Sequence, residues 1–115
     1  MSDDAKRKVL GLLGLGLRGR LVVVGVDQSR AAAQRGKAAF ALVAPDASKN
    51  SLDKIVPMLR AKRIPSSEMF GAAELGSAVG RETTAVVVIT DRQLANGIRK
   101  LVESSPDRAH QEGSA

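Results

Sequence analysis

The stretch VVVGVDQSRAAAQRGKAAFALVAPD, Val22–Asp46, decides the fold class of this chain of 115 residues. Two apolar runs, Val22–Val24 and Ala39–Ala44, flank a segment that consists almost entirely of Ala, Gln and Arg. Short continuous apolar runs bounded by turn residues are typical of strands that are buried on both faces. The segment between them predicts a short helix, roughly Gln28–Arg35, with a glycine on each side. A strand, a helix and a second strand in this order indicate an α/β protein.

The rest of the chain continues this alternation of helices and strands. We expect helices over residues 4–15, 28–35, 51–62, 72–79 and 92–103, and strands over residues 21–24, 39–44 and 85–90, with a weak strand near 66–70. This order predicts a compact three-layer domain, residues 1–103, in which a sheet lies between two layers of helices. Residues 104–115 have no apolar periodicity, so we expect a disordered tail there.

Capping residues and helix breakers predict where the helices begin and end. Gly16 and Gly19 are expected to end the first helix. Asp27 or Ser29 is expected to cap the second helix at its N terminus. Pro57 lies inside the third predicted helix, which indicates either a kink or a later start.

Positive charge is concentrated in the first half of the chain. The net charge is +6, but residues 1–63 hold 13 Lys and Arg against five Asp and Glu, whereas residues 64–115 hold five against seven. A basic half on a small domain suggests a polyanionic partner, most often nucleic acid. A surface that only keeps the protein in solution is the alternative.

The composition excludes several classes of protein. The chain has no Cys, which excludes disulfides, thiol catalysis and Cys-based zinc sites. No apolar run approaches the roughly 18 residues of a membrane span. The N-terminal sequence MSDDAKRK is too polar for a signal peptide. We therefore expect a soluble, cytoplasmic protein that does not contact a membrane.

The sequence contains no organised catalytic or metal-binding constellation. The G-x-G-x-x-G match at Gly14–Gly19 follows a helix and precedes a strand, the reverse of the dinucleotide fingerprint. His110 is the only His, so a His-based triad or metal site is excluded. Asp46, Asp53 and Asp91 remain as carboxylates, but the first two fall in a turn and in a first helical turn, where acids serve structure. We expect no enzyme, no cofactor and no metal.

The turn after the first strand carries the strongest local binding signal. The glycine that ends the strand leads to a helix N terminus, where free N–H groups and the positive dipole end attract phosphates or base-edge acceptors. Asp27 and Gln28 lie at that end. Arg30 and Gln34 share one face of the helix, and Lys37 follows just beyond it. An ordinary capped helix is the alternative explanation.

A resemblance to a known family extends over roughly residues 10–95. It begins with LLGLGLRGRLVVVGVDQSRAAAQRGKAAFALVAPDASKN, residues 12–50, and resumes in KRIP (Lys62–Pro65), AELGSAVGRE (Ala73–Glu82) and AVVVITD (Ala85–Asp91). These segments resemble the kink-turn RNA-binding ribosomal-protein superfamily of the large-subunit seven-Ae and thirty-e type, in particular its small bacterial YlxQ-like members. The resemblance implies an α-β-α sandwich with a mixed four-stranded sheet, and a domain that binds structured RNA without catalysing a reaction.

The resemblance also implies a binding edge made of two segments. The first is the turn Gly25–Gln28, where the family has Gly, a small residue, Asn or Lys, and then Glu or Gln. The second is the loop Gly80–Ala85 before the last strand. In the family these segments grip the tandem sheared G·A pairs and a flipped nucleotide of a kink-turn. This chain departs from the pattern with an acid at Asp27, and with Ala31 where the family has Lys.

From the resemblance we expect Gly25 to permit close approach of the RNA and Gln28 to bond a base edge. Thr83 and Thr84 are expected to contact the flipped nucleotide. The cationic members of the set are expected to contact phosphates. The full set of expected RNA-binding residues is Gly25, Val26, Asp27, Gln28, Arg30, Gln34, Lys37, Arg81, Glu82, Thr83 and Thr84.

The expected partner is structured RNA, with ribosomal RNA and the ribosome as candidates, and the expected state is a monomer. An interaction module that binds protein on the same fold is the alternative, because the acid at Asp27 is repelled by phosphate. Asp27 itself has two expected roles. It either caps the helix or accepts a hydrogen bond from a guanine.

Overall fold

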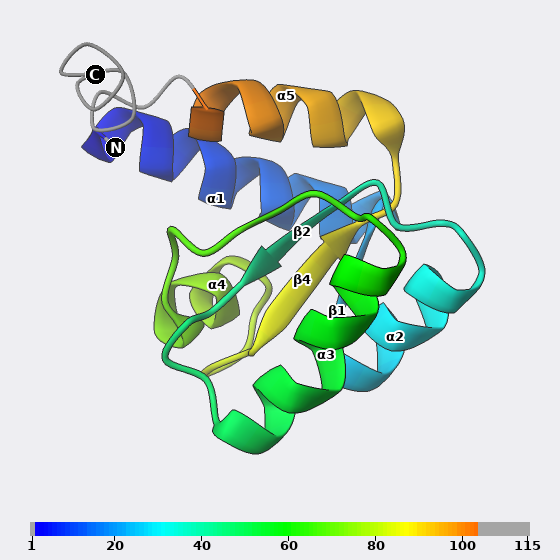
Figure 1. Ribbon diagram of the computed structural model, residues 1–115. Coiled ribbons are helices and arrows are strands. Elements are labelled where there is room, and N and C mark those ends of the chain that lie inside the picture. The colour runs from blue at the N-terminus through cyan, green and yellow to red at the C-terminus, as the bar shows by residue number, and fades with distance from the viewer. Residues whose placement is uncertain (1, 104–115) are drawn as a thin grey trace, which may run out of the picture.

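The computed structural model describes residues 2–103, and its helices and strands follow one another in the predicted order (Figure 1). The predicted tail, residues 104–115, lies outside the described residues. The elements are α1 (Asp3–Arg18), β1 (Val22–Val24), α2 (Val26–Gln34), β2 (Phe40–Val43), α3 (Lys49–Ala61), β3 (Ser66–Ser67), α4 (Ala72–Ala78), β4 (Val86–Ile89) and α5 (Arg92–Glu103).

The four strands form one mixed sheet in the order β1-β4-β2-β3. β4 pairs antiparallel with β1 on one side and with β2 on the other, and β2 pairs parallel with the two-residue β3. The register opposes Val88 to Val23 and to Ala41. β1, β2 and β3 therefore run in one direction, and β4 runs against them through the middle of the sheet.

Helices cover both faces of the sheet, which explains why the central strands are apolar at every position. Phe40, Leu42, Val87 and Ile89 pack with α1, α4 and α5 on one face. The alternate residues of the same two strands pack with α2 and α3 on the other face. The three layers are visible in Figure 1, where α1 and α5 lie above the sheet and α2 and α3 below it. No helix among residues 2–103 is long and apolar enough to cross a membrane.

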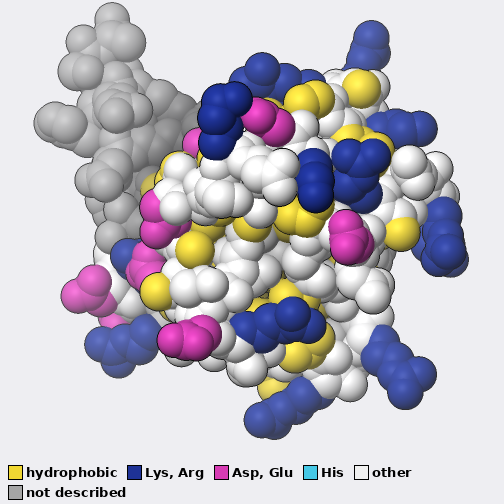
Figure 2. All heavy atoms as spheres, turned by 90° about the horizontal axis from the view of Figure 1, so that it is seen from below, with side chains coloured by type: hydrophobic (Ala, Val, Ile, Leu, Met, Phe, Trp, Pro, Cys, Tyr) yellow, Lys and Arg dark blue, Asp and Glu magenta, His cyan; other side chains and the backbone are white. Residues whose placement is uncertain are grey.

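Charged side chains are unevenly distributed over the surface. In the view of Figure 2, Lys and Arg side chains project mainly from the right-hand side, the side on which α2 lies in Figure 1. Asp and Glu gather mostly on the left.

The first helix extends further than its glycines predict. We expected an end near Leu15 with Gly16 as a breaker, whereas α1 runs to Arg18 and only Gly19 caps it. A Cβ atom at Gly16 would lie 2.6 Å from the Leu94 side chain and 3.0 Å from that of Val22. Gly16 therefore lets α1 approach the sheet and α5 closely, and it does not end the helix.

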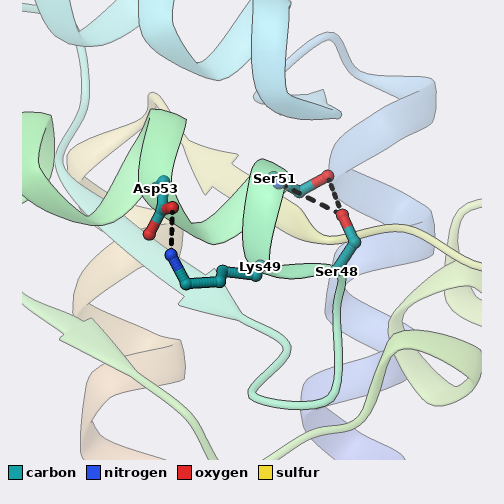
Figure 3. Close-up of polar contacts among 4 residues, drawn as sticks. All are labelled: Ser48, Lys49, Ser51 and Asp53. Atoms are coloured by element: carbon teal, nitrogen blue, oxygen red, sulfur yellow. Dashed lines mark hydrogen bonds and ion pairs between the residues drawn. The ribbon is translucent and has the colours of Figure 1, made fainter.

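The third helix begins earlier than predicted and continues through Pro57. Ser48 is its N-cap, because the Ser48 hydroxyl oxygen accepts a hydrogen bond from the backbone N–H of Ser51 at 3.1 Å (Figure 3). Lys49 and Asp53 form an ion pair of 3.1 Å one turn apart on the exposed face. Pro57 consequently does not delay the start of α3.

The three aspartates considered as a carboxylate site are separate and serve structure. Asp46 accepts a hydrogen bond from the N–H of Ala72 at 2.8 Å, at the start of α4. Asp91 accepts one from the N–H of Leu94 at 2.8 Å, at the start of α5. Asp46 follows β2 and Asp91 follows the antiparallel β4, so these two lie at opposite ends of the sheet.

A salt bridge between Lys6 and Glu74 joins α1 to α4 at an N–O distance of 2.9 Å. Glu74 also accepts a hydrogen bond from the N–H of Gly71 at 3.1 Å. The hydrogen bond from Lys6, together with that from Gly71, holds the pKa of the Glu74 carboxyl below its ordinary value. The same hydrogen bond and the negative charge of Glu74 raise the pKa of Lys6.

We predict that Glu74→Gln lowers the stability at neutral pH by about 0.5 kcal/mol or less, because both side chains of the pair are a third or more exposed. A lowered carboxyl pKa contributes stability above the ordinary pKa of Glu, and this contribution is lost as the pH falls through the lowered pKa. Denaturant unfolding of the parent and of the variant should therefore give a difference in the free energy of unfolding at pH 7, and this difference should vanish in acid. A difference that grows in acid contradicts the role of the ion pair.

Ser29 is a polar residue in the core. It lies in the first half of α2 and is completely buried. Its hydroxyl has no hydrogen-bond partner among the described residues. We predict that Ser29→Ala raises the stability by about 1 kcal/mol, because it removes an unsatisfied hydroxyl from the core. The melting temperature measures this gain, and a clear fall in it would show that the hydroxyl is bonded in solution.

Candidate nucleic-acid interface

Two loops that are far apart in the sequence meet at one end of the sheet. β1 ends where β4 begins, because the two strands are antiparallel. The β1–α2 turn (Gly25–Gln28) therefore lies beside the α4–β4 loop (Gly80–Ala85). The contact is direct: the N–H of Gly25 donates to the carbonyl oxygen of Val86 at 3.0 Å, and the hydroxyl of Thr84 donates to the same oxygen at 3.3 Å.

The β1–α2 turn depends on the backbone freedom of Gly25. Its φ of 92° and ψ of 165° lie in a region that is nearly exclusive to glycine. Gly25 is itself the N-cap of α2, and no side chain caps this helix. The prediction that Asp27 or Ser29 caps α2 is therefore wrong. The helix starts earlier because the hydrogen bond to Val86 fixes Gly25 at the end of the strand.

Asp27 and Gln28 occupy the first turn of α2, and both side chains are exposed. The Asp27 carboxylate makes no hydrogen bond or ion pair with any described residue. An acid in a first helical turn interacts favourably with the positive end of the helix dipole. The first N–H groups of α2 have no carbonyl of the helix to donate to, so they remain available to acceptors outside it.

The α4–β4 loop is held against α4 by the backbone. The N–H of Arg81 donates to the carbonyl of Gly76 at 2.8 Å, and the N–H of Thr84 donates to that of Ala72 at 3.1 Å. Gly80 adopts a positive φ of 74°. A Cβ atom at Gly76 would lie 2.7 Å from the Cα of Thr83, so only glycine at this position lets the loop lie so close to the helix.

A hollow of about 240 Å³ lies between the two loops, along the outer edge of β1. Two residues with polar side chains, Gln28 and Arg81, are among those that line it. The remaining lining is apolar, from Leu17, Val22–Val24 and Val79. A concave site that combines apolar side chains with a few polar groups is the usual form of a binding site.

The structure brings together only part of the predicted set. The exposed members near the hollow are Asp27, Gln28, Arg81, Glu82 and Thr83. In the same region Gly25 and Val26 form the backbone of the turn and are half-buried.

Thr84 belongs to the loop, but its side chain is turned inward. It is 7% exposed, and its hydroxyl is already bonded to Val86. Arg30 is half-buried and donates to the backbone carbonyl of Lys54 at 2.9 Å, so this Arg ties α2 to α3.

Gln34 and Lys37 lie away from the hollow. α2 spans nine residues, or about 13 Å, and carries the chain from the β1–α2 turn to the opposite end of the sheet. Lys37 lines a different hollow there, with Thr90 and Arg92. The charge of the candidate interface is therefore mixed, since its exposed charges are those of Asp27, Arg81 and Glu82.

The apolar lining of the hollow was not among the predicted site residues. Leu17 lies in the last turn of α1, beyond the predicted helix end near residue 15, and its spacing of four from Leu13 continues the apolar side of the helix. Val79 faces the hollow through the turn at Gly80. Among residues 2–103, no cluster of three or more His, Cys, Asp or Glu side chains could hold a metal ion.

Residues 7–98 match the model of the ribosomal protein L7Ae/L30e/S12e/Gadd45 family. The chain is 33% identical to the RNA-binding protein YlxQ of Bacillus subtilis (strain 168) over 92 residues, which are 80% of this chain and 92% of that protein. It is 28% identical to the RNA-binding protein YlxQ of Enterococcus faecium over 103 residues, or 90% of this chain and 99% of that protein.

Two solved structures share the fold. A protein of unknown function from Bacillus halodurans C superimposes with a TM-score of 0.76 at 26% identity, over 84% of this chain and 98% of that one. The Giardia lamblia 15.5kD RNA binding protein superimposes with a TM-score of 0.69 at 20% identity, over 89% and 88% of the two chains.

The expected mixed four-stranded α-β-α sandwich is thus confirmed, and the named relatives are RNA-binding proteins and not enzymes. Because the family match spans most of the chain and the likeness to YlxQ proteins covers nearly their whole length, this chain belongs to the ribosomal protein L7Ae/L30e/S12e/Gadd45 family, as a YlxQ-like member.

Proposed function

We propose that this protein binds structured RNA without catalysing a reaction, and that it recognises a kink-turn or a kink-like bend through the β1–α2 turn and the α4–β4 loop. Ribosomal RNA is the first candidate ligand, and the protein acts as a monomer in the cytoplasm. The proposal starts from its family and from the RNA-binding YlxQ relatives.

The meeting of the two loops at one hollow carries the proposal. A sharp bend in RNA presents base edges and closely spaced phosphates together, so a reader needs a hydrogen-bonding group and a cation side by side. The Gln28 amide can bond a base edge, and the Arg81 guanidinium can bond a phosphate in a bidentate manner. The exposed Thr83 lies in the same loop and is the proposed contact for a flipped nucleotide.

Rigidity of the two loops supports recognition by shape. The shared bonds to the Val86 carbonyl and the close packing of Gly76 against Thr83 fix the loops before any ligand binds. A preorganised surface loses less conformational entropy on binding, and it selects an RNA that already has, or easily adopts, the matching bend.

The acids Asp27 and Glu82 favour a second candidate function, a protein-binding module on the same fold. Both are exposed at the candidate interface, where a phosphate would be repelled by them. The two functions differ in one measurable property, because only the RNA-binding protein should distinguish a kink-turn from a straight duplex of the same composition.

We predict that Gln28→Ala and Arg81→Ala each weaken binding to a kink-turn RNA by about tenfold, equal to about 1.4 kcal/mol. The reason is the loss of one base-edge contact or one phosphate contact at the hollow. Fluorescence anisotropy with labelled RNA measures the affinity. The comparison RNA has its tandem G·A pairs replaced by Watson–Crick pairs, and its weaker binding should change little.

Gln93→Ala and Arg7→Ala are the matched controls, since both side chains are exposed on α5 and α1, outside the two loops. These controls should bind the kink-turn like the parent protein, and all four variants should keep its melting temperature. If the parent binds the kink-turn and the straight duplex equally, kink recognition is refuted, and if it binds neither RNA, the protein-binding function replaces RNA binding.

We predict that Asp27→Asn tightens kink-turn binding about two- to threefold at low salt, because it removes repulsion between a carboxylate and nearby phosphates. The gain should fade as added salt screens the charge. Stability should change by no more than about 0.5 kcal/mol, because Asp27 caps no N–H group and contributes only through the helix dipole. Weaker binding of the variant would instead mean that the carboxylate accepts a hydrogen bond from a guanine.

A further inference from the structure

A second group of loops meets at the end of the sheet opposite the β1–α2 turn. α1, α2 and α3 all end there, because each precedes one of the three strands that run in the same direction. Backbone hydrogen bonds join the junctions: the N–H of Thr90 donates to Leu21 at 2.8 Å, and that of Ala39 donates to Ile89 at 2.8 Å. The length of α2, about 13 Å, separates this end from the candidate interface.

Six exposed cations lie at these junctions, and we call them the basic end. They are Arg20, Arg35, Lys37, Lys62, Arg63 and Arg92.

None of the six forms a hydrogen bond through its side chain or an ion pair within the described part of the chain. The only acid in the junction segments 19–21, 35–39, 62–65 and 90–92 is Asp91, whose carboxylate already accepts from Leu94. Within residues 2–103 the basic end is therefore unpaired positive charge.

The surface between these cations is hollowed. One hollow of about 630 Å³ is lined by Lys37 and Arg92 together with the residues just before β2 and the first turns of α5. A neighbouring hollow of about 350 Å³ is lined by Arg35 and Lys62, with Gly36 shared between the two. Four of the six cations thus line open depressions in the surface, where a strand of phosphates has room to lie.

Two of the cations have a backbone conformation that is unfavourable for any residue with a Cβ atom. Arg20 and Arg63 have φ angles of 61° and 55°, in the left-handed region that favours glycine and Asn. The equivalent junction after α2 uses Gly36, with a φ of 71°. The fold therefore accepts glycine at such a junction, and arginine at the other two indicates a role for the side chain.

Helix dipoles explain only part of this charge. The C termini of α1, α2 and α3 carry partial negative charge, which Arg18 and Arg60 in the last turns of α1 and α3 already oppose. The effect reaches Arg20 and Arg63, which directly follow the helix caps, but it does not explain Arg92, which begins α5 at the positive end of that helix dipole.

We propose that the basic end is a second RNA-binding surface, which grips the phosphate backbone of a helical RNA segment without reading its sequence. Arginine predominates there, and its planar guanidinium matches phosphate geometry. An RNA surface is favoured over a membrane surface, because no large apolar side chain of these junctions is exposed to enter a bilayer. This goes beyond the proposed function, since one RNA could then contact the protein at both ends of the sheet.

The test uses a straight RNA duplex of about 20 base pairs without a kink, and the full-length triple variant Lys37→Gln, Lys62→Gln, Arg92→Gln. We expect the parent to bind the duplex with an affinity that falls steeply with salt, and the variant to bind at least tenfold more weakly at low salt. The slope of log affinity against log salt should decrease by about two to three, because each phosphate contact contributes nearly one to that slope.

The matched control removes the same charge elsewhere, with Arg7→Gln, Lys8→Gln and Lys54→Gln, all exposed outside the basic end. This control should retain most of the duplex affinity. An equal loss in both triple variants overturns the proposal, because net charge alone would then explain binding. Binding of the parent to anionic phosphatidylglycerol vesicles with no affinity for the duplex also overturns it.

The double variant Arg20→Gly, Arg63→Gly separates binding from folding. Glycine suits both backbone positions, so the melting temperature should stay the same or rise while duplex affinity falls several-fold. Unchanged duplex affinity in this variant contradicts a role for these two side chains. Arg81→Ala should leave duplex binding intact, so failure of kink recognition and failure of the basic end give different results.

Discussion

The insertion of β4 between β1 and β2, antiparallel to both, is the constraint on which the rest of the structure depends. It buries Val86–Ile89 on both faces and fixes which loops can meet. The carbonyl of Val86 receives both the N–H of Gly25 and the hydroxyl of Thr84, so the start of this one strand binds the two loops of the candidate interface together. The end of the same strand leads into the opposite, basic junctions.

The order of elements was predictable because the decisive signals are local. Val86–Ile89 and Phe40–Val43 are apolar at every position, which only a strand covered on both faces requires. Helix ends were less predictable, because they depend on partners elsewhere in the chain. Gly16 looked like a breaker, but its missing side chain makes room for Leu94 and Val22, and no local pattern contains that information.

The candidate site was predictable as two segments and not as a set of side chains. The family resemblance pointed to both loops, and the antiparallel pairing of β1 with β4 brings them together. The separation of Lys37 from the site follows from the length of α2, and the inward turn of Thr84 follows from its bond to Val86. The mixed charge of the site and the concentration of cations at the other end could not be predicted without the sheet topology, because the charged residues are spread along the sequence.

The aliphatic core has a consequence for the kind of RNA that this protein can hold. The chain contains no Trp or Tyr, and its two Phe rings, Phe40 and Phe70, are 3% and 1% exposed. No aromatic ring on the described surface can therefore stack on an unpaired base, an interaction worth about 1–3 kcal/mol per base in proteins that bind single strands. The proposed RNA binding therefore relies on contacts other than aromatic stacking, which favours folded RNA that stacks its own bases over flexible single strands.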